Sequence, residues 1–122
     1  MITESSLVGL NIYQDGRIVY ANAASAGMTG YTADELLALS PRQVLDMVHP
    51  EDRKMVRERS RARIEGKSAP SRYEYRILRK DGVISWLELT ASVIDYKGNP
   101  AVLTSFLDIT ERKRAEQALR ES

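Results

Sequence analysis

Few residues of this chain have side chains suited to catalysis. The sequence contains one histidine, His49, and no cysteine. Without cysteine there can be no disulfide, thiolate metal site, cysteine nucleophile or cysteine–flavin photochemistry. A serine–histidine–aspartate triad would have to use His49, and no nucleophile-elbow or glycine-rich phosphate-binding motif accompanies it. We therefore expect no enzymatic activity and no bound metal, and we expect His49 to cap a helix near the surface.

The composition is typical of one ordinary globular domain. The chain has 122 residues, of which 43% are hydrophobic and 29% charged, and a formal net charge of +1. It has neither a secretion signal nor an apolar run of the ~20 residues that span a bilayer. We therefore expect a cytoplasmic domain without membrane contact.

Basic residues concentrate in residues 53–67, where seven arginines and lysines are interrupted by Glu58 and Glu65. A nucleic-acid surface would need clustered charge with stacking aromatics, and none is interleaved here. We interpret this stretch as the solvated face of a helix and expect no nucleic-acid partner.

The hydrophobic patterns divide the chain into three parts. Two short alternating strands surround a turn at Gly16, and helices capped by Asn22 and Thr32 follow, with a longer helix that begins at Pro50. Three more strands and a charged tail helix complete the chain. The predicted ranges are 7–13 and 17–21 for the first strands, about 50–64 for the long helix, 72–79, 83–95 and 101–109 for the later strands, and 110–122 for the tail. Segregated strands and helices predict an α+β fold with an antiparallel sheet.

Several segments, taken in order, resemble the PAS family. They are DGRIVYAN (15–22), MTGYTADELL (28–37), HPED (49–52) and the closing half from Glu74 to Leu119, with its Asp108-Ile109-Thr110 signature. The resemblance implies a five-stranded antiparallel sheet in the order 2-1-5-4-3 with helices wrapped on one face. It also implies a flank at 1–6, a sensor domain at 7–110 and a linker helix from 111 to 122.

The resemblance further implies a sensing or relaying role in a larger signalling protein. The expected output is most often a sensor histidine kinase of a two-component phosphorelay. The alternative is a ligand-free dimerisation module of a cyclic-dinucleotide enzyme or a transcription regulator. In either case the effector domain would lie downstream in the same polypeptide.

Alternation along the strands predicts which side chains line the space between sheet and helices. We expect a shared inner surface made of Ile12, Ile18, Tyr20, Ser60, Tyr73, Tyr75, Ile77, Leu87, Leu89, Val102, Thr104 and Phe106. This surface is either a filled core or a pocket for a small organic molecule, as in other members of the family. The inward tyrosines keep the second possibility open, because a buried phenol needs a hydrogen-bond partner.

The familiar cofactors of the family do not match this sequence. The light-sensing branch needs a cysteine and reads flavin with side-chain amides, where this chain carries Ile77, Leu87 and Phe106. The heme-binding branch commonly takes a histidine from the long connecting helix, and His49 precedes that helix. Met28, Met47 and Met55 are interpreted as core residues rather than heme ligands. We therefore expect neither flavin nor heme.

Trp86 is predicted to lie on the outer face of the sheet with Arg76, Leu78 and Glu88. A bare indole on a sheet surface favours docking of a flanking helix or a second subunit. The alternative is cover by neighbouring side chains such as Arg76 or Leu78. We expect a homodimer that uses this face.

The junction between the last strand and the tail helix is the most specific predicted site. We expect Thr110 to cap the tail helix and Asp108 to pair with an arginine such as Arg112. In the family, Asp108, Ile109 and Thr110 would couple the sheet to the downstream helix. The alternative is an ordinary capping motif without a signalling role.

Overall fold

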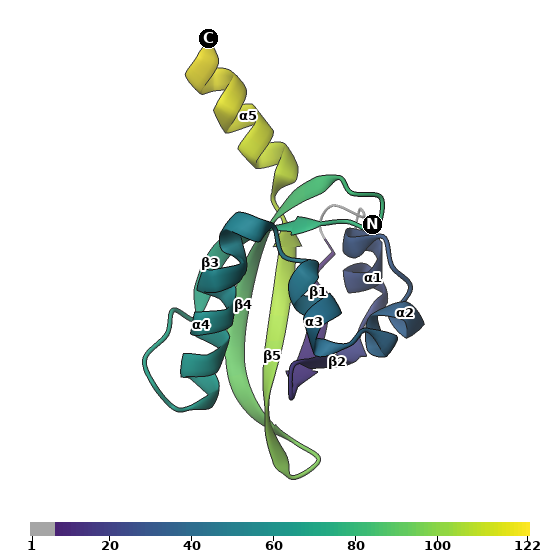
Figure 1. Cartoon of the computed structure of the whole chain (residues 1–122). Coiled ribbons are helices and arrows are strands. Elements are labelled where there is room, and N and C mark those ends of the chain that lie inside the picture. The colour runs from purple at the N-terminus through teal and green to yellow at the C-terminus, as the bar shows by residue number, and fades with distance from the viewer. Residues whose placement is uncertain (1–6) are drawn as a thin grey trace.

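A computed structural model describes residues 7–122 of the chain, so the predicted flank at 1–6 lies outside the described residues. The central element is one antiparallel sheet in the order β2-β1-β5-β4-β3 (Figure 1). Its strands are β1 (Gly9–Gln14), β2 (Arg17–Ala21), β3 (Arg72–Leu78), β4 (Ile84–Tyr96) and β5 (Asn99–Asp108). The predicted α+β fold and strand order are confirmed.

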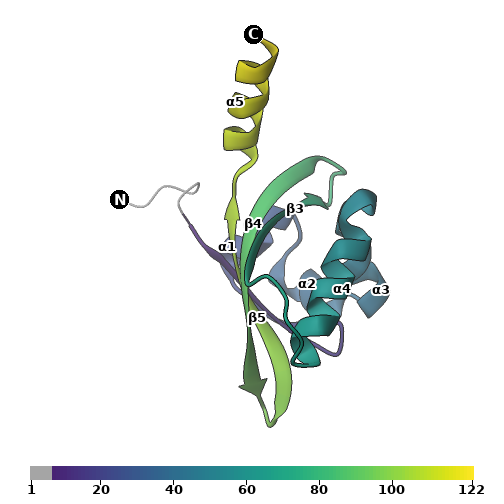
Figure 2. The same cartoon turned by 90° about the vertical axis from the view of Figure 1, so that its left-hand side faces the viewer.

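The segment between β2 and β3 forms a helical layer on one side of the sheet (Figure 2). It comprises α1 (Ala23–Thr29), α2 (Ala33–Ala38), α3 (Pro41–Asp46), the 3-10 turn η2 (Pro50–Asp52) and α4 (Arg53–Ile64). A last helix, α5 (Thr110–Glu121), leaves the end of β5 and projects away from the domain. Within residues 7–122, no helix has the length and apolar character needed to cross a membrane.

Local sequence signals begin the short helices as predicted. The Asn22 side chain accepts a hydrogen bond from the Ser25 N–H at the start of α1. Thr32 and Glu35 form a reciprocal capping box at α2. His49 caps η2, because its Nδ1 accepts from the Glu51 N–H at 3.1 Å. These caps satisfy backbone donors that have no partner inside the helix.

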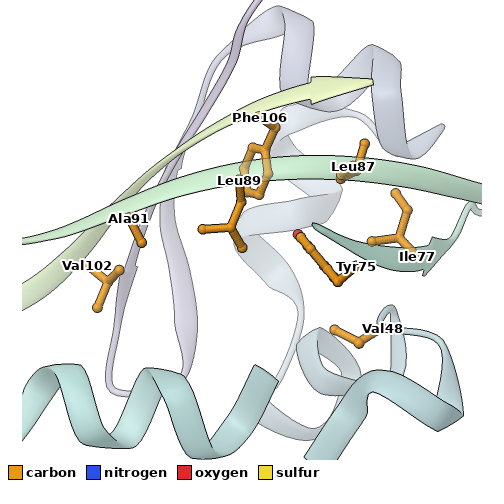
Figure 3. Packing of buried hydrophobic residues seen from close by; sticks show 8 residues of the cluster. All are labelled: Val48, Tyr75, Ile77, Leu87, Leu89, Ala91, Val102 and Phe106. Atoms are coloured by element: carbon orange, nitrogen blue, oxygen red, sulfur yellow. The ribbon is translucent and has the colours of Figure 1, made fainter. Parts of the chain in front are cut away.

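Apolar side chains from β3, β4 and β5 form the larger core cluster (Figure 3). Its buried members are Val48, Tyr75, Ile77, Leu87, Leu89, Ala91, Val102 and Phe106. Leu89 and Phe106 are direct cross-strand partners on β4 and β5. The predicted inward faces of these three strands agree with this cluster, except that Val93 lies near the far end of β4 and is exposed.

A smaller core lies under the short helices. Ile18 of β2, Leu36 of α2 and Met47 are its buried members. The inner surface is therefore divided into two clusters rather than enclosing a single space. Ile18 belongs to the smaller one.

The facing of β1 and part of β2 differs from the prediction. Asn11 and Thr104 are opposite each other and buried, whereas Ile12 pairs with Leu103 on the outer face. Tyr20 pairs with Ile12 and is 44% exposed, so the inward placement of Ile12 and Tyr20 was wrong. The register shifts between Ile12 and Tyr13, which leaves an extra residue in β2 and turns Ile18 and Tyr20 to opposite faces.

The free edge of β3 is covered by the segment before α4. The His49 N–H donates to the Arg76 carbonyl at 2.9 Å, and the Leu78 N–H donates to the Met47 carbonyl at 2.7 Å. Asp52 completes this cover by accepting from the Arg76 N–H at 2.8 Å. Such cover protects an edge strand from pairing with other chains.

Candidate functional site: a small polar cavity, the outer face and the helix junction

A small cavity lies between the sheet and the helices. Its volume is about 20 Å³, and its lining mixes polar with apolar side chains. The lining residues are Asn11, Tyr13, Ser25, Met28, Thr29, Met47, Tyr75, Ile77, Leu87 and Phe106. A space of this size holds about one water molecule.

The polar wall of the cavity is a connected hydrogen-bond cluster. The Ser25 hydroxyl donates to Asn11 Oδ1 at 2.6 Å, and Asn11 Nδ2 donates to the Tyr13 hydroxyl at 3.1 Å. Thr104 donates to the Asn11 carbonyl at 3.3 Å. Asn11 therefore connects α1 to β1 and β5, and this buried amide is satisfied by protein groups.

Two tyrosines from different strands line the same cavity. Burial raises the pKa of Tyr13 to about 12, although its hydrogen bond with Asn11 acts in the opposite direction. Burial raises the pKa of Tyr75 well above its usual value, and Tyr13 and Tyr73 add to this shift. Both phenols are therefore neutral at physiological pH, where each can donate one hydrogen bond.

The other predicted pocket residues that face the helices do not line the cavity. Tyr73 is half-buried, with the Arg59 guanidinium 4.5 Å from its ring centre. Ser60 is half-buried on α4 and does not line the cavity. Leu89, Val102 and Thr104 are buried in the strands beside it.

Sequence reasoning missed six of the lining residues: Asn11, Tyr13, Ser25, Met28, Thr29 and Met47. In residues 8–13, simple alternation favours the register that places Leu10 and Ile12 inward, whereas the structure turns Asn11 and Tyr13 inward. The one informative signal was Asn11, a polar residue in an apolar strand next to helices that carry Ser25 and Thr29.

At the junction, two hydrogen bonds attach the start of α5 to β4 and a third attaches it to the end of β5. The Trp86 N–H donates to the Thr110 hydroxyl at 3.0 Å. The Ile109 N–H donates to the Trp86 carbonyl at 3.0 Å, and Ile109 is buried. Asp108 Oδ1 accepts from the Thr110 N–H at 2.9 Å. The end of β5 and the first residue of α5 are therefore held both by β4 and by a hydrogen bond between Asp108 and Thr110.

Two predicted junction contacts are corrected. Thr110 does not cap α5, because its hydroxyl accepts from Trp86 and the helix starts without a side-chain cap. Asp108 does not pair with Arg112. Arg112 instead contacts Glu74 at 2.7 Å and Glu88 at 4.0 Å on the outer face of the sheet. Arg112 therefore pairs with the carboxylate of Glu74 on β3 rather than with that of Asp108.

Trp86 is half-buried on the outer face, as its alternation predicted, and two cations cover it. The Arg76 guanidinium carbon lies 5.3 Å from its ring centre, and Lys113 Nζ of α5 lies at 4.8 Å. Glu88 is engaged by Arg72 at 2.7 Å. The flanking helix therefore contributes part of the cover, in addition to the expected Arg76.

The opposite half of the outer face is apolar. Cross-strand pairing on β1, β2 and β5 brings Ile12 beside both Tyr20 and Leu103. Val8 and Leu107 are exposed at one end of the same strands. We call Val8, Leu10, Ile12, Tyr20, Leu103 and Leu107 the apolar half, and Arg72, Glu74, Arg76, Trp86 and Glu88 the charged half.

Comparison with known proteins gives a consistent picture. A family model described as PAS fold matches residues 18–107. A blue-light-activated histidine kinase of Brucella ovis is 38% identical over 87 residues, which cover 71% of this chain and 17% of the relative. The sensor histidine kinase TmoS of Ectopseudomonas mendocina is 28% identical over 98% of this chain and 12% of its own length. The chain thus spans less than a fifth of the curated relatives.

Solved structures share the same fold. A sensory box histidine kinase/response regulator from Burkholderia thailandensis superimposes with a TM-score of 0.71 at 26% identity, covering 93% of this chain and 85% of that chain. A PAS domain from Colwellia psychrerythraea gives a TM-score of 0.67 at 24% identity over 85% of this chain and 87% of that chain. The family match, the strand order and these neighbours agree, and the chain belongs to the PAS fold family.

Proposed function

We propose that this chain is a signal-relay PAS domain of a sensor histidine kinase, and that it acts on a downstream effector through α5. The curated relatives are histidine kinases in which the matching segment is a small part. The observation that carries the proposal is the junction, where Trp86 of β4 is bonded to both Ile109 and Thr110. A displacement of β4 against β5 would therefore move the first residues of α5 directly.

The experiment is autophosphorylation of the full-length protein that contains this domain. Thr110→Val removes the acceptor for the Trp86 N–H but keeps the side-chain shape. We expect the kinase to lose most of its response to stimulus while the domain stays folded. Ser105→Ala, on the outer face of β5 and away from the junction, is the control. An unchanged response in Thr110→Val contradicts the proposal.

The cavity favours a relay without a large ligand. A volume of about 20 Å³ suits one water rather than an organic molecule, and most of the predicted pocket is occupied by core side chains. The sequence contains no cysteine, so we do not assign to this chain the blue-light activity that the relative's name states. Native mass spectrometry of the untreated protein tests this: a stoichiometric retained molecule, flavin and heme included, contradicts a ligand-free relay.

A second candidate role, self-association, is favoured by the apolar half. Its residues lie together across three strands, and Val8, Tyr20 and Leu107 among them are exposed, whereas Trp86 is already covered within its own chain. Association through this patch would make a two-fold dimer, the commonest symmetry. The proposed interface therefore lies on strands β1, β2 and β5 rather than around Trp86, where it was expected from the sequence.

Analytical ultracentrifugation across micromolar concentrations tests the interface. Leu107→Asp places a charge in the apolar half and should weaken association by about 2 kcal/mol or more. Val93→Asp, at an exposed site on the other side of the sheet, is the control. Trp86→Ala should have the smaller effect of the two interface variants. A dimer that responds to Trp86→Ala and not to Leu107→Asp returns the interface to the charged half.

A further inference from the structure

Two positive charges share the ring of Trp86, the one tryptophan of the chain. One belongs to Arg76 of β3 and the other to Lys113 of α5, at 5.3 Å and 4.8 Å from the ring centre. A ring attracts each cation, but the cations repel each other where water is partly excluded. The arrangement is therefore stable only if each charge is balanced by an acidic side chain.

Each cation is paired with a different carboxylate, and the two carboxylates come from different layers; the one paired with Lys113, Glu74, also binds Arg112 at 2.7 Å. Arg76 Nη2 donates to Asp52 Oδ1 at 2.8 Å, and Arg76 Nε donates to Asp52 Oδ2 at 3.1 Å. Lys113 Nζ lies 2.5 Å from Glu74 Oε1. Asp52 closes η2 directly before α4, so it belongs to the helical layer, whereas Glu74 belongs to the sheet.

Asp52 is the main partner of Arg76. It forms a two-pronged pair with the guanidinium and also accepts the Arg76 backbone N–H at 2.8 Å. Its side chain is 14% exposed. Glu51 also reaches Arg76 at 3.1 Å, but it is 72% exposed, and an exposed pair contributes little.

We propose that Asp52 holds the first turn of helix α5 on the outer face of the sheet, by balancing Arg76 so that Lys113 can share the Trp86 ring. Glu74 and Arg76 are two residues apart on the same face of β3. Once Arg76 loses Asp52, it repels Lys113 and competes with it for Glu74. Displacement of the start of α4 therefore loosens α5 around the edge of β3, without passing through the core.

The coupling between Asp52 and α5 adds a second route to the proposed relay. Only its role in signalling depends on the proposed function. The physical coupling is measurable in the 122-residue chain alone. Its failure leaves the junction through Thr110 untouched, and failure of the kinase assay leaves this coupling untouched. The two proposals are therefore tested separately.

The experiment compares wild type with Asp52→Asn, which keeps the side-chain shape and removes the charge. Hydrogen exchange of the α5 amides from Lys113 onward should accelerate on the order of threefold, the size expected from one ion pair or cation–π contact. Trp86 fluorescence should move to longer wavelength as the ring becomes wetter. The control is Glu35→Gln, which breaks a pair with Lys80 at 2.6 Å, away from the indole.

A double-mutant comparison tests whether the effect of Asp52 on α5 passes through Lys113. In Lys113→Gln protein, Asp52→Asn should produce little further change in α5 exchange, because the contact that it weakens is already absent. If Asp52→Asn fails to fold, Arg76→Lys replaces it, since an ammonium lacks the two-pronged geometry. The proposal is overturned if α5 exchange and Trp86 emission stay at wild-type values, if Glu35→Gln changes them equally, or if the two substitutions are additive.

Discussion

Neighbouring residues of β5 show how differently the two faces of the sheet are used. Phe106 faces the helices and is 3% exposed, whereas Leu107 faces outward and is 39% exposed. The inner face is closed around a water-sized cavity, and the outer face carries ion pairs on one half and bare apolar side chains on the other. Stability therefore resides mainly on the inner face, and the surfaces to which we assign the proposed signalling and self-association lie on the outer face.

The sharpest test of this contrast uses the two neighbours themselves. Phe106→Ala should lower the free energy of unfolding by about 3–5 kcal/mol, because it removes a buried ring and leaves a cavity. Leu107→Ala, next to it on the exposed face, should lower it by no more than about 1 kcal/mol. Urea unfolding of both variants at low protein concentration measures the difference. Equal losses would contradict the division between the faces.

A smaller effect is expected from the polar cluster. Ser25→Ala leaves Asn11 Oδ1 buried without its 2.6 Å donor and should cost about 1–3 kcal/mol. Ser105→Ala, on the outer face of β5, should change stability by less than about 0.5 kcal/mol. Thermal unfolding of this matched serine pair distinguishes a structural cluster from a tolerant polar surface.

The smallest effect concerns acid stability on the outer face. Hydrogen bonds from Arg76 lower the pKa of Asp52, so the folded state binds its proton more weakly than the unfolded chain does. The pair therefore contributes its full stability above the unfolded pKa, near 3.8, and loses it as pH falls through the lower folded pKa. Below this window the contribution is gone.

The variant comparison isolates that contribution. The pKa values of Glu35 and Glu74 are also lowered, chiefly by hydrogen bonds from Lys80 and Lys113, so the wild type loses stability in acid for several reasons. The difference in stability between wild type and Asp52→Asn should be constant near pH 6 and should shrink as pH falls below the unfolded pKa near 3.8. Urea unfolding at several pH values measures it, and a constant difference would mean that the carboxylate charge of Asp52 contributes nothing.

Local signals account for the parts of the structure that sequence reasoning predicted well. Asn22 and Thr32 cap their helices through groups only three residues away, and strand β4 alternates buried leucines, Leu87 and Leu89, with polar residues on its other face. Interactions of this kind depend on a few neighbouring residues, so the sequence alone specifies them. The same is true of His49, whose side chain caps the turn that it begins.

The face of β1 could not be decided from its own residues. Simple alternation favours Leu10 and Ile12 inward, but pairing with β5, more than 80 residues later, turns Asn11 and Tyr13 inward instead. The extra residue in β2 then separates Ile18 from Tyr20 in a way that strict alternation does not predict.

The sequence by itself therefore determined the fold class, the order of elements, the caps at Asn22, Thr32 and His49, and most inward residues of β3, β4 and β5. The tertiary structure decided that Asn11 and Tyr13 line the cavity, that Arg112 binds Glu74 instead of Asp108, and that Lys113 covers Trp86. The physical reason is the same in each case. These contacts join residues that are distant in the chain and have several chemically suitable partners, so only the folded geometry selects among them.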